Sequence, residues 1–318
     1  GAAVRAAWAP PPAMADQVVT CILRSGGRDL ALLDRALVSL EQQSHAAVRA
    51  LVVAWRDAES IRSFVARRAA SRLLIRVIDS PDTGCRSTAL WNGLAAVDTP
   101  FFAVLDDDDT LMPNHLAAGL ATLSAYPNVD LAYSGTVEVD ESRSARSLLW
   151  FAHFEPIRFR VANTIASHAW VARARLLPSI GDDPEFVVGE DYYLLLRFAC
   201  VGHFAPTWRL TAEYRRRDDD PTHSALAALP ASLERIRRRF HFAPVRPEGL
   251  YREAVGEDAA RILKRLIRRR QFRKGLTLYL RDIARLPARL AALPGFLSER
   301  GVRGLLRRIA DRGVGRGR

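Results

Sequence analysis

Short apolar runs alternate with helical segments through the first third of the chain, and no other sequence feature limits the fold as strongly. Four runs have the length and composition of buried strands: residues 18–23, 50–54, 73–78 and 101–105. Helical segments separate them, at residues 30–43, around Ile61, and at residues 87–96. Such a strand–helix alternation predicts an α/β fold with a mostly parallel, Rossmann-like sheet, in which ligands bind at the carboxyl ends of the strands.

The rest of the chain is less regular. The elements expected there are a helix at residues 114–124, a strand at 131–133, loop and hairpin at 138–160, and a helix at 192–201. From Glu234 onward, amphipathic helical stretches are interrupted by prolines and glycines. The expected organisation is an N-terminal linker or disordered end at residues 1–15, a main domain at 16–240, and a helical extension at 241–318.

The formal net charge of +12 is concentrated in the C-terminal extension. Residues 251–318 hold about 19 Lys and Arg against about 6 Asp and Glu, so the preceding part of the chain is near neutral. Three explanations compete for this basic segment: helices that cover the sheet, a surface for anionic lipid, and a contact for nucleic acid or another protein. Arginine on amphipathic helices is typical of attraction to anionic headgroups. Helical cover with peripheral membrane affinity is therefore expected, and nucleic acid is not an expected partner.

The cysteines and the hydropathy of the sequence indicate the cellular compartment. Cys21, Cys85 and Cys200 are odd in number, widely spaced and in or beside apolar segments, which argues against a disulfide framework. No window approaches the roughly 18 apolar residues of a membrane span, and residues 1–15 lack the apolar core of a signal peptide. We expect a cytoplasmic protein, soluble or peripheral on the inner face of the plasma membrane.

The apolar run at residues 101–105 ends abruptly in four consecutive aspartates. Adjacent carboxylates repel one another, and a cation offsets this repulsion. Oxygen ligands of this kind suit Mg²⁺ or Mn²⁺, which fill other positions with phosphate oxygens and water. Because side chains alternate along a strand, Asp106 and Asp108 should point the same way, which makes them the metal and ribose candidates. Asp107 would turn aside, and Asp109 would lie outside or cap the following helix. The alternative is an exposed acidic turn.

A second acidic pair, Glu190-Asp191, directly precedes the helix expected at residues 192–201. A carboxylate in this position can cap the helix and interact with its dipole, or it can serve as a general base. In the catalytic interpretation, Asp191 accepts the proton of an acceptor hydroxyl as that oxygen attacks an anomeric carbon. This direct displacement inverts configuration, and Glu190 positions the acceptor or supports the base.

Several arginines are candidates for binding a diphosphate, because guanidinium forks match phosphate oxygens. They are Arg24, Arg86 and the three arginines at residues 215–217. Each of them has the alternative of an ordinary surface charge.

In the order and spacing of these motifs the chain resembles the inverting glycosyltransferases of family 2, which have the GT-A fold. The resemblance covers roughly residues 18–224 and rests on residues 28–30 with 36–40, 86–94, 102–109 with 112–113, and 189–192 with 196–197. It implies that Asp106 and Asp108 bind the metal and the donor's ribose and diphosphate. It also implies that Asp191 is the base and that Arg86 faces the nucleotide.

Two departures from the family pattern concern the donor. Residues 23–26 read Leu-Arg-Ser-Gly where many members carry Pro-Thr-x-Asn, and residues 54–57 read Ala-Trp-Arg-Asp where many carry a base-binding Asp. Asp57 is the candidate replacement for that carboxylate, and Trp55 either stacks on a base or packs. The candidate residues for the donor nucleotide are Arg24, Asp57, Arg86, Asp106 and Asp107.

The expected activity is a metal-dependent, inverting transfer of a sugar from a nucleotide-diphosphate-sugar donor to a hydroxyl acceptor. The acceptor would be a glycan or a lipid-linked molecule of cell-envelope polysaccharide synthesis. A sugar-phosphate nucleotidyltransferase is one alternative, but the chain has no Gly-rich, Lys-bearing loop after the first strand, and its two lysines both lie in the basic extension. A non-catalytic module that binds a nucleotide or a partner is the other alternative.

Overall fold

The computed structural model describes residues 17–68, 71–81, 86–150, 154–160, 163–180, 186–217 and 226–240. Within them the chain forms a nine-stranded sheet in the order β3-β2-β1-β4-β8-β6-β9-β5, with β7 paired to β6. The linker expected at residues 1–15 and the basic extension expected at 241–318 lie outside the described residues.

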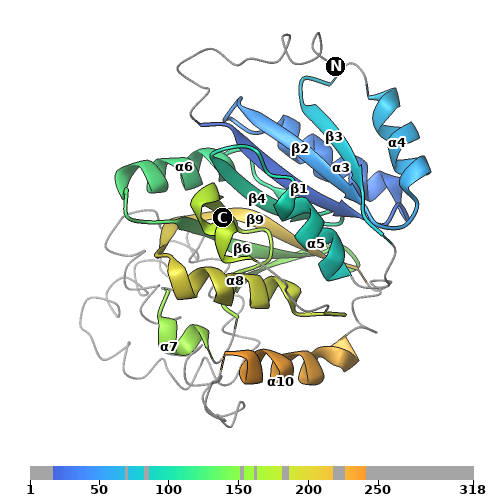
Figure 1. The fold of residues 1–318 in the computed structure, drawn as a ribbon. Coiled ribbons are helices and arrows are strands. Elements are labelled where there is room, and N and C mark those ends of the chain that lie inside the picture. Colours follow the sequence, from blue (N-terminus) through green and yellow to red (C-terminus); the bar gives the residue numbers. More distant parts are fainter. Residues whose placement is uncertain are drawn as a thin grey trace, which may run out of the picture. The chain divides into compact units, whose positions relative to one another are not determined.

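The first four strands build the parallel half of this sheet (Figure 1). They are β1 (Val19–Ser25), β2 (Val48–Ala54), β3 (Leu74–Asp79) and β4 (Phe101–Asp106), and neighbours among them pair in parallel. The connecting helices are α3 (Leu30–Glu41), α4 (Ala58–Arg67) and α5 (Arg86–Ala95). The strand–helix alternation predicted from the sequence is confirmed for this half.

The second half of the sheet is mixed in direction. Its strands are β5 (Thr110–Leu111), β6 (Leu131–Asp140), β7 (Ala145–Trp150), β8 (Trp170–Arg173) and β9 (Phe204–Arg216). β8 runs antiparallel to both β4 and β6, whereas β9 runs parallel to β6 and antiparallel to β5. The strand expected at residues 131–133 is the start of β6, and the β6–β7 turn and β7 lie in the segment 138–160 that was expected to hold loop and hairpin. The sequence pattern did not indicate β8 or β9, and β9 is only half-buried along most of its length, so it lacks a marked apolar run.

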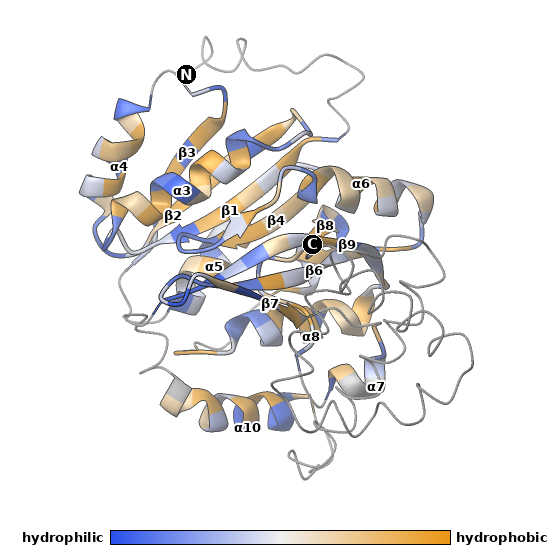
Figure 2. Ribbon diagram, turned by 180° about the vertical axis from the view of Figure 1, so that it is seen from behind, coloured by the Kyte–Doolittle hydropathy of each residue, from blue (hydrophilic) through white to orange (hydrophobic). Residues whose placement is uncertain are grey.

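Helices cover both faces of the sheet. Beyond the first three they are α6 (His115–Ala125), α7 (Pro156–Phe159), α8 (Glu190–Val201) and α10 (Leu229–Arg239), with 3-10 turns at Ala174–Ser179 and Leu226–Ala228. Buried side chains of α3, α4 and α6 pack on one face, and those of α5, α8 and α10 pack on the other. In Figure 2 the central strands are mostly hydrophobic, as expected for strands buried on both faces.

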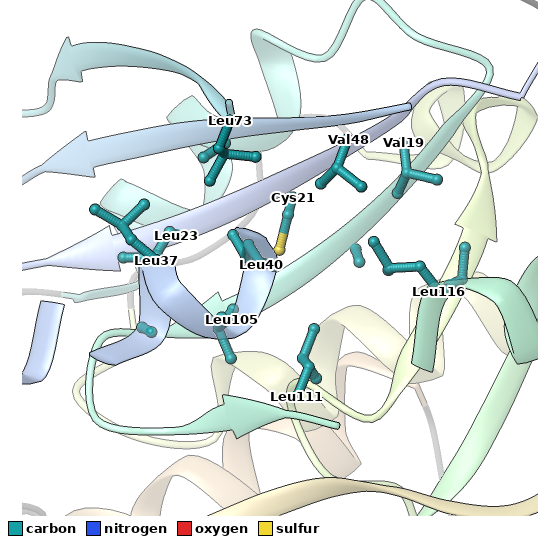
Figure 3. Close-up of a cluster of buried hydrophobic side chains, with 14 of the residues drawn as sticks. Val19, Cys21, Leu23, Leu37, Leu40, Val48, Leu73, Leu105, Leu111 and Leu116 are labelled. Atoms are coloured by element: carbon teal, nitrogen blue, oxygen red, sulfur yellow. The ribbon is translucent and has the colours of Figure 1, made fainter. Parts of the chain in front are cut away.

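The core cluster on the first face is built from alternate residues of β1. Val19, Cys21 and Leu23 point to this face and pack with Leu37 and Leu40 of α3 (Figure 3). The residues of this cluster recur at every second position of β1 and at helical spacing in α3. Because both spacings can be read from the sequence, the pattern predicted both elements correctly.

On the second face, α5 lies very close to the sheet at Gly93. A Cβ atom on this residue would lie 2.4 Å from Ile22 Cγ2 and 3.1 Å from Val53 Cγ2, so a side chain larger than hydrogen would clash with both strands. This close packing holds α5, which begins at Arg86, against strands β1 and β2.

None of the described helices is long and apolar enough to cross a membrane. Cys21 is buried in the first core cluster, and Cys200 is exposed. Both carry free thiols, and Cys85 lies outside the described residues.

Candidate active site

Four elements bring charged side chains together at the carboxyl ends of the central strands. The parallel register places Arg24 of β1 directly beside Asp106, the last residue of β4. Helix α5 begins at Arg86, and helix α8 begins at Glu190. Gly189 precedes α8 with a φ of 92°, a left-handed conformation that favours glycine.

The four charged side chains form a closed set of contacts, which we call the arginine–carboxylate ring: Arg24, Asp106, Arg86 and Glu190. Arg24 donates from Nε to Asp106 Oδ1 at 2.8 Å and from Nη1 to Glu190 Oε1 at 2.7 Å. Arg86 donates from Nη2 to Asp106 Oδ2 at 2.9 Å, and its Nε lies 2.9 Å from Glu190 Oε1. Each cation therefore contacts both anions.

The members of the ring differ in how far their side chains are exposed to solvent. The side chains of Arg24 and Glu190 are each 3% exposed, whereas that of Arg86 is 31% exposed. Buried charges are tolerated when each one is matched by an opposite charge with good geometry. Two cations and two anions satisfy this condition, and Arg86 is the member of the ring that reaches solvent.

The ring fixes the charges of Asp106 and Arg86. Burial alone would raise the pKa of Asp106, but the guanidinium groups of Arg24 and Arg86 hold that pKa below its ordinary value. Burial alone would lower the pKa of Arg86, and the carboxylates of Glu190 and Asp106 raise it instead. Asp106 and Arg86 are therefore ionised at neutral pH.

Three further carboxyl groups next to the ring have raised pKa values, and we call them the raised-pKa carboxylates: Asp107, Asp108 and Asp191. Burial raises the pKa of Asp107 to about 6, although its Oδ2 accepts a 2.6 Å hydrogen bond from Ser25 Oγ. Burial, followed by Asp109 and the other aspartates, raises the pKa of Asp108 to about 8. Burial and then the charge of Glu190 raise the pKa of Asp191 to about 6.

The prediction for Asp109 was wrong. Its side chain is buried, not outside the fold, and α6 begins only at His115, so Asp109 does not cap that helix. Oδ1 accepts a 2.9 Å hydrogen bond from the backbone N–H of Arg215, and Oδ2 lies 3.1 Å from His168 Nδ1. The physical reason is a turn: the N–H of Asp109 donates to the carbonyl of Asp106 at 3.2 Å, so strand alternation ends at Asp106.

His168 is a site residue that the sequence did not reveal. It is fully buried in contact with Asp109, in the turn that leads into β8. Burial alone would lower its pKa, but Asp109, Asp106 and Asp108 together raise it. No periodic pattern or motif marks this position, since the contact with Asp109 depends on the pairing of β8 with β4.

The residues proposed to recognise the nucleobase lie at the end of β2. Asp57 is exposed, and its Oδ1 accepts the backbone N–H of Ser60 at 3.1 Å, which makes Asp57 the N-cap of α4. The ring of Trp55 packs beside Gly26, where a Cβ would lie 3.4 Å from it, and the Arg56 guanidinium lies 4.3 Å from the Trp55 centroid. Recognition of a nucleobase by Asp57 or Trp55 stays a prediction.

Among the arginines at residues 215–217, Arg217 is the one whose guanidinium lies near Asp108. Arg217 Nη2 is 4.0 Å from Asp108 Oδ2. Arg215 instead pairs with Glu141, with Nε 2.7 Å from Oε1, and Arg216 pairs with Asp140.

No group of three or more His, Cys, Asp or Glu side chains in the described part of the chain is arranged to hold a metal ion. Both carboxylate oxygens of Asp106 face guanidinium groups. Asp108 is half-buried and is crowded by neighbouring carboxylates, which is the electrostatic setting that a cation relieves.

The fold and the site together define a class of protein. A parallel half-sheet extended by a mixed half, with helices on both faces, is the GT-A-like arrangement. Residues 18–177, half of the chain, match the family model of glycosyl transferase family 2. The chain belongs to this family, and the protein is a glycosyltransferase.

Solved structures agree on the fold. S. aureus TarS 1-349 in complex with UDP-GlcNAc is similar, with a TM-score of 0.58, 15% sequence identity, and coverage of 88% of this chain and 80% of that chain. A second structure of S. aureus TarS 1-349 gives a TM-score of 0.51 at 14% identity, covering 77% of this chain and 82% of that chain. No curated protein matches the sequence.

Proposed function

We propose that the protein transfers a sugar from a nucleotide-diphosphate-sugar donor to an acceptor hydroxyl, with inversion, using a divalent metal and Asp191 as the general base. One observation carries the proposal. The arginine–carboxylate ring ties the acidic motif at the end of β4 to the acidic motif at the start of α8, through Arg24 and Arg86. Donor-binding and proton-accepting groups therefore share one site.

Arg86 is the candidate for binding the donor diphosphate. Its side chain is 31% exposed, its charge is secured by two carboxylates, and its planar fork can bind phosphate oxygens in pairs. Asp106 holds this fork in place from the end of β4. Asp107, on the turn that follows, is held by Ser25 and completes the proposed nucleotide side of the site.

Asp108 fits a divalent cation of the hard, oxygen-binding kind, because its carboxylate is 25% exposed and crowded by other carboxylates. Asp106 is the second predicted ligand, and one of its oxygens would have to exchange a guanidinium for the cation. Burial and then repulsion by neighbouring aspartates raise the pKa of Asp108, and a cation beside it would relieve that repulsion. When bound, Mn²⁺ or Mg²⁺ would neutralise the charge that develops on the departing diphosphate.

Asp191 is the candidate base. Its pKa, raised to about 6, leaves it mostly ionised at neutral pH yet basic enough to take a proton. Asn163 Nδ2 lies 3.5 Å from its Oδ2 and limits its orientation. Asp191 would accept the acceptor's hydroxyl proton while the oxygen bonds to the anomeric carbon and the bond to the diphosphate breaks on the opposite face, which inverts configuration.

The proposed donor rests on similarity to a solved structure, and the proposed acceptor rests on the family resemblance and the basic C-terminal segment. The TarS structure that resembles this fold binds UDP-GlcNAc, so a UDP-sugar is the first donor to test. The expected acceptor is a glycan or a lipid-linked molecule of the cell envelope, reached from the cytoplasmic side. Binding of the full chain to anionic vesicles in a flotation assay at moderate salt would support membrane contact by the basic segment.

A thermal-shift screen tests the donor site. UDP, GDP, dTDP and CMP are each added with and without Mn²⁺ or Mg²⁺ to wild type and to Asp108→Ala. A ligand at about 100 times its Kd stabilises the folded state by roughly 2.7 kcal/mol, which gives a clear rise in Tm. We expect a metal-dependent rise with one nucleotide, and we expect Asp108→Ala to lose it.

Turnover separates a transferase from a binding module. Slow, metal-dependent hydrolysis of the donor by wild type is the expected result, since water can replace the acceptor. Nucleotide binding without any hydrolysis or transfer would favour the non-catalytic alternative. No shift with any nucleotide, in protein shown to be folded, would contradict the proposed function.

A further inference from the structure

Arg24 stands in the segment where the sequence departs from its family, and its surroundings differ from those of Arg86. Only 3% of its side chain is exposed, and its Nε and Nη1 atoms donate to Asp106 and Glu190. Arg86 contacts the same two carboxylates, but its side chain is 31% exposed. A donor diphosphate can therefore approach Arg86 from solvent, whereas Arg24 is enclosed in the interior.

Glu190 is placed differently from its neighbour Asp191. Glu190 is the first residue of α8, is 3% exposed, and pairs with both arginines of the ring. Successive residues of an α-helix are about 100° apart around its axis. With Glu190 fixed inward on Arg24, the side chain of Asp191 is turned to a different direction, where it is half-buried and 3.5 Å from Asn163.

Arg24 therefore connects two remote parts of the chain. The parallel register of β1 and β4 places it beside Asp106, and its contact with Glu190 spans 166 residues. Because strand β1 lies in the middle of the sheet and is buried along its whole length, this connection starts from a rigid element.

We propose that Arg24 is a positioning residue for the base: through Glu190 it holds the first turn of α8, and with it Asp191, against the end of β4. In this role Arg24 does not bind the donor diphosphate, which is left to Arg86. The inference rests on the proposed function, since it assumes that Asp191 is the base.

The charges around Asp191 determine the direction in which each variant should shift the pKa of this residue. Glu190 of the same helix raises the pKa of Asp191, whereas Arg86 of α5 and Arg24 of β1 lower it. Asn163, from the segment before β8, and the backbone N–H of Tyr192 are its polar neighbours. Removing the anion should make Asp191 a stronger acid, and removing the cation should make it a weaker one.

The experiment is the pH profile of kcat for donor consumption, measured in wild type and three variants. Glu190→Gln should move the acidic midpoint down by about one pH unit, and Arg24→Met should move it up by about one pH unit. Arg24→Lys keeps the charge but loses the double contact, so its midpoint should stay near that of wild type while kcat falls. A loss of structure alone would not move the midpoint in opposite directions.

Arg49→Met is the matched control. Arg49 lies near the start of β2, at the opposite end of the strands from the ring, and pairs with Asp98 at 3.0 Å. It should leave both kcat and the midpoint unchanged. If Arg24→Met does not fold, Glu190→Gln and Arg24→Lys still decide the matter, because the first must lower the midpoint and the second must lower kcat without moving it.

Thermal unfolding provides a readout without substrate. The double variant Arg24→Met/Glu190→Gln should lose less in Tm than the sum of the two single losses, because the two residues contact each other. Additive losses, or midpoints that move in the same direction, would overturn the inference while leaving the transferase intact. If wild type consumes no donor at all, the proposed function is wrong, and the inference about Arg24, which rests on that function, is wrong too.

Discussion

The arginine–carboxylate ring and the raised-pKa carboxylates lie side by side, and the same two acidic motifs supply both. At the end of β4, Asp106 enters the ring, whereas the pKa of Asp108 is raised to about 8. At the start of α8, Glu190 enters the ring, whereas the pKa of Asp191 is raised to about 6. Burial acts on all of these groups, so the difference lies in their partners.

This contrast shows how one site can be both rigid and reactive. The ring matches its charges internally and holds the ends of β1, β4, α5 and α8 together. The raised-pKa carboxylates face other carboxylates, so a proton or a cation changes their energy strongly. Carboxyl groups whose environments drive their pKa values apart divide structural and chemical roles between them.

The largest expected effect is on catalysis. Asp191→Asn should lower kcat by about 10²- to 10⁴-fold, because the general base is lost, while the donor KM and Tm change little, because the ring stays intact. Steady-state kinetics with the donor identified by thermal shift would measure this. Asp98→Asn, at an exposed ion pair near the other end of the strands, is the control. If Asp191→Asn retains more than a tenth of the activity, the base is another residue.

The next effect is on stability as a function of pH. In the folded protein the pKa of Asp108 is raised to about 8 and that of His168 is also raised, so both hold protons that the unfolded chain releases at lower pH. Their stabilising contribution is therefore lost as pH rises through the folded pKa. Asp107, Asp191 and His115, at about 6, 6 and 3, titrate mainly below pH 6.5.

We expect the free energy of unfolding to fall by about 2 kcal/mol between pH 6.5 and 8, since each such proton is equivalent to about 1.4 kcal/mol per pH unit. Urea denaturation in the presence of EDTA would measure this fall. A free energy that stays constant or rises over this window would show that Asp108 is ionised with the ring's help, and the contrast between the two regions would break down.

The smallest effect concerns a carboxylate outside both regions. Asp57 caps α4, so Asp57→Ala should lower the Tm slightly, while Asp57→Ser, which keeps a capping oxygen, should leave it nearly unchanged. Thermal unfolding of the two variants would measure the difference. Nucleotide binding by Asp57→Ser then tests the predicted base contact separately. If the Ser variant keeps the cap but loses nucleotide binding, the Asp57 carboxylate makes the contact with the base.

The sequence predicted the parallel half of the fold because β1, β2 and β4 are buried on both faces and read as continuous apolar runs. It could not indicate β9, whose residues are half-buried. It also located both acidic motifs, which stand at the ends of predictable elements.

The sequence could not show which carboxylate of each acidic motif pairs with an arginine. The burial of Asp109 depends on a turn that begins at Asp106, and the burial of Glu190 depends on Arg24, 166 residues away. Arg24 itself was identified as a candidate, but only as a ligand for phosphate. Long-range pairing of charges follows from sheet register and helix placement, which local patterns do not contain.

The most direct test of the contrast compares Asp106→Asn with Asp108→Asn by urea denaturation at pH 8 in EDTA. The two substitutions are chemically identical and two residues apart. Asp106→Asn leaves Arg24 and Arg86 without one of their anions, and we expect it to destabilise the protein by about 3 kcal/mol. Asp108→Asn removes a crowded carboxylate, and we expect it to stabilise the protein by about 1 kcal/mol. Changes of the same sign in both variants would contradict the division of the site into a charge-matched ring and raised-pKa carboxylates.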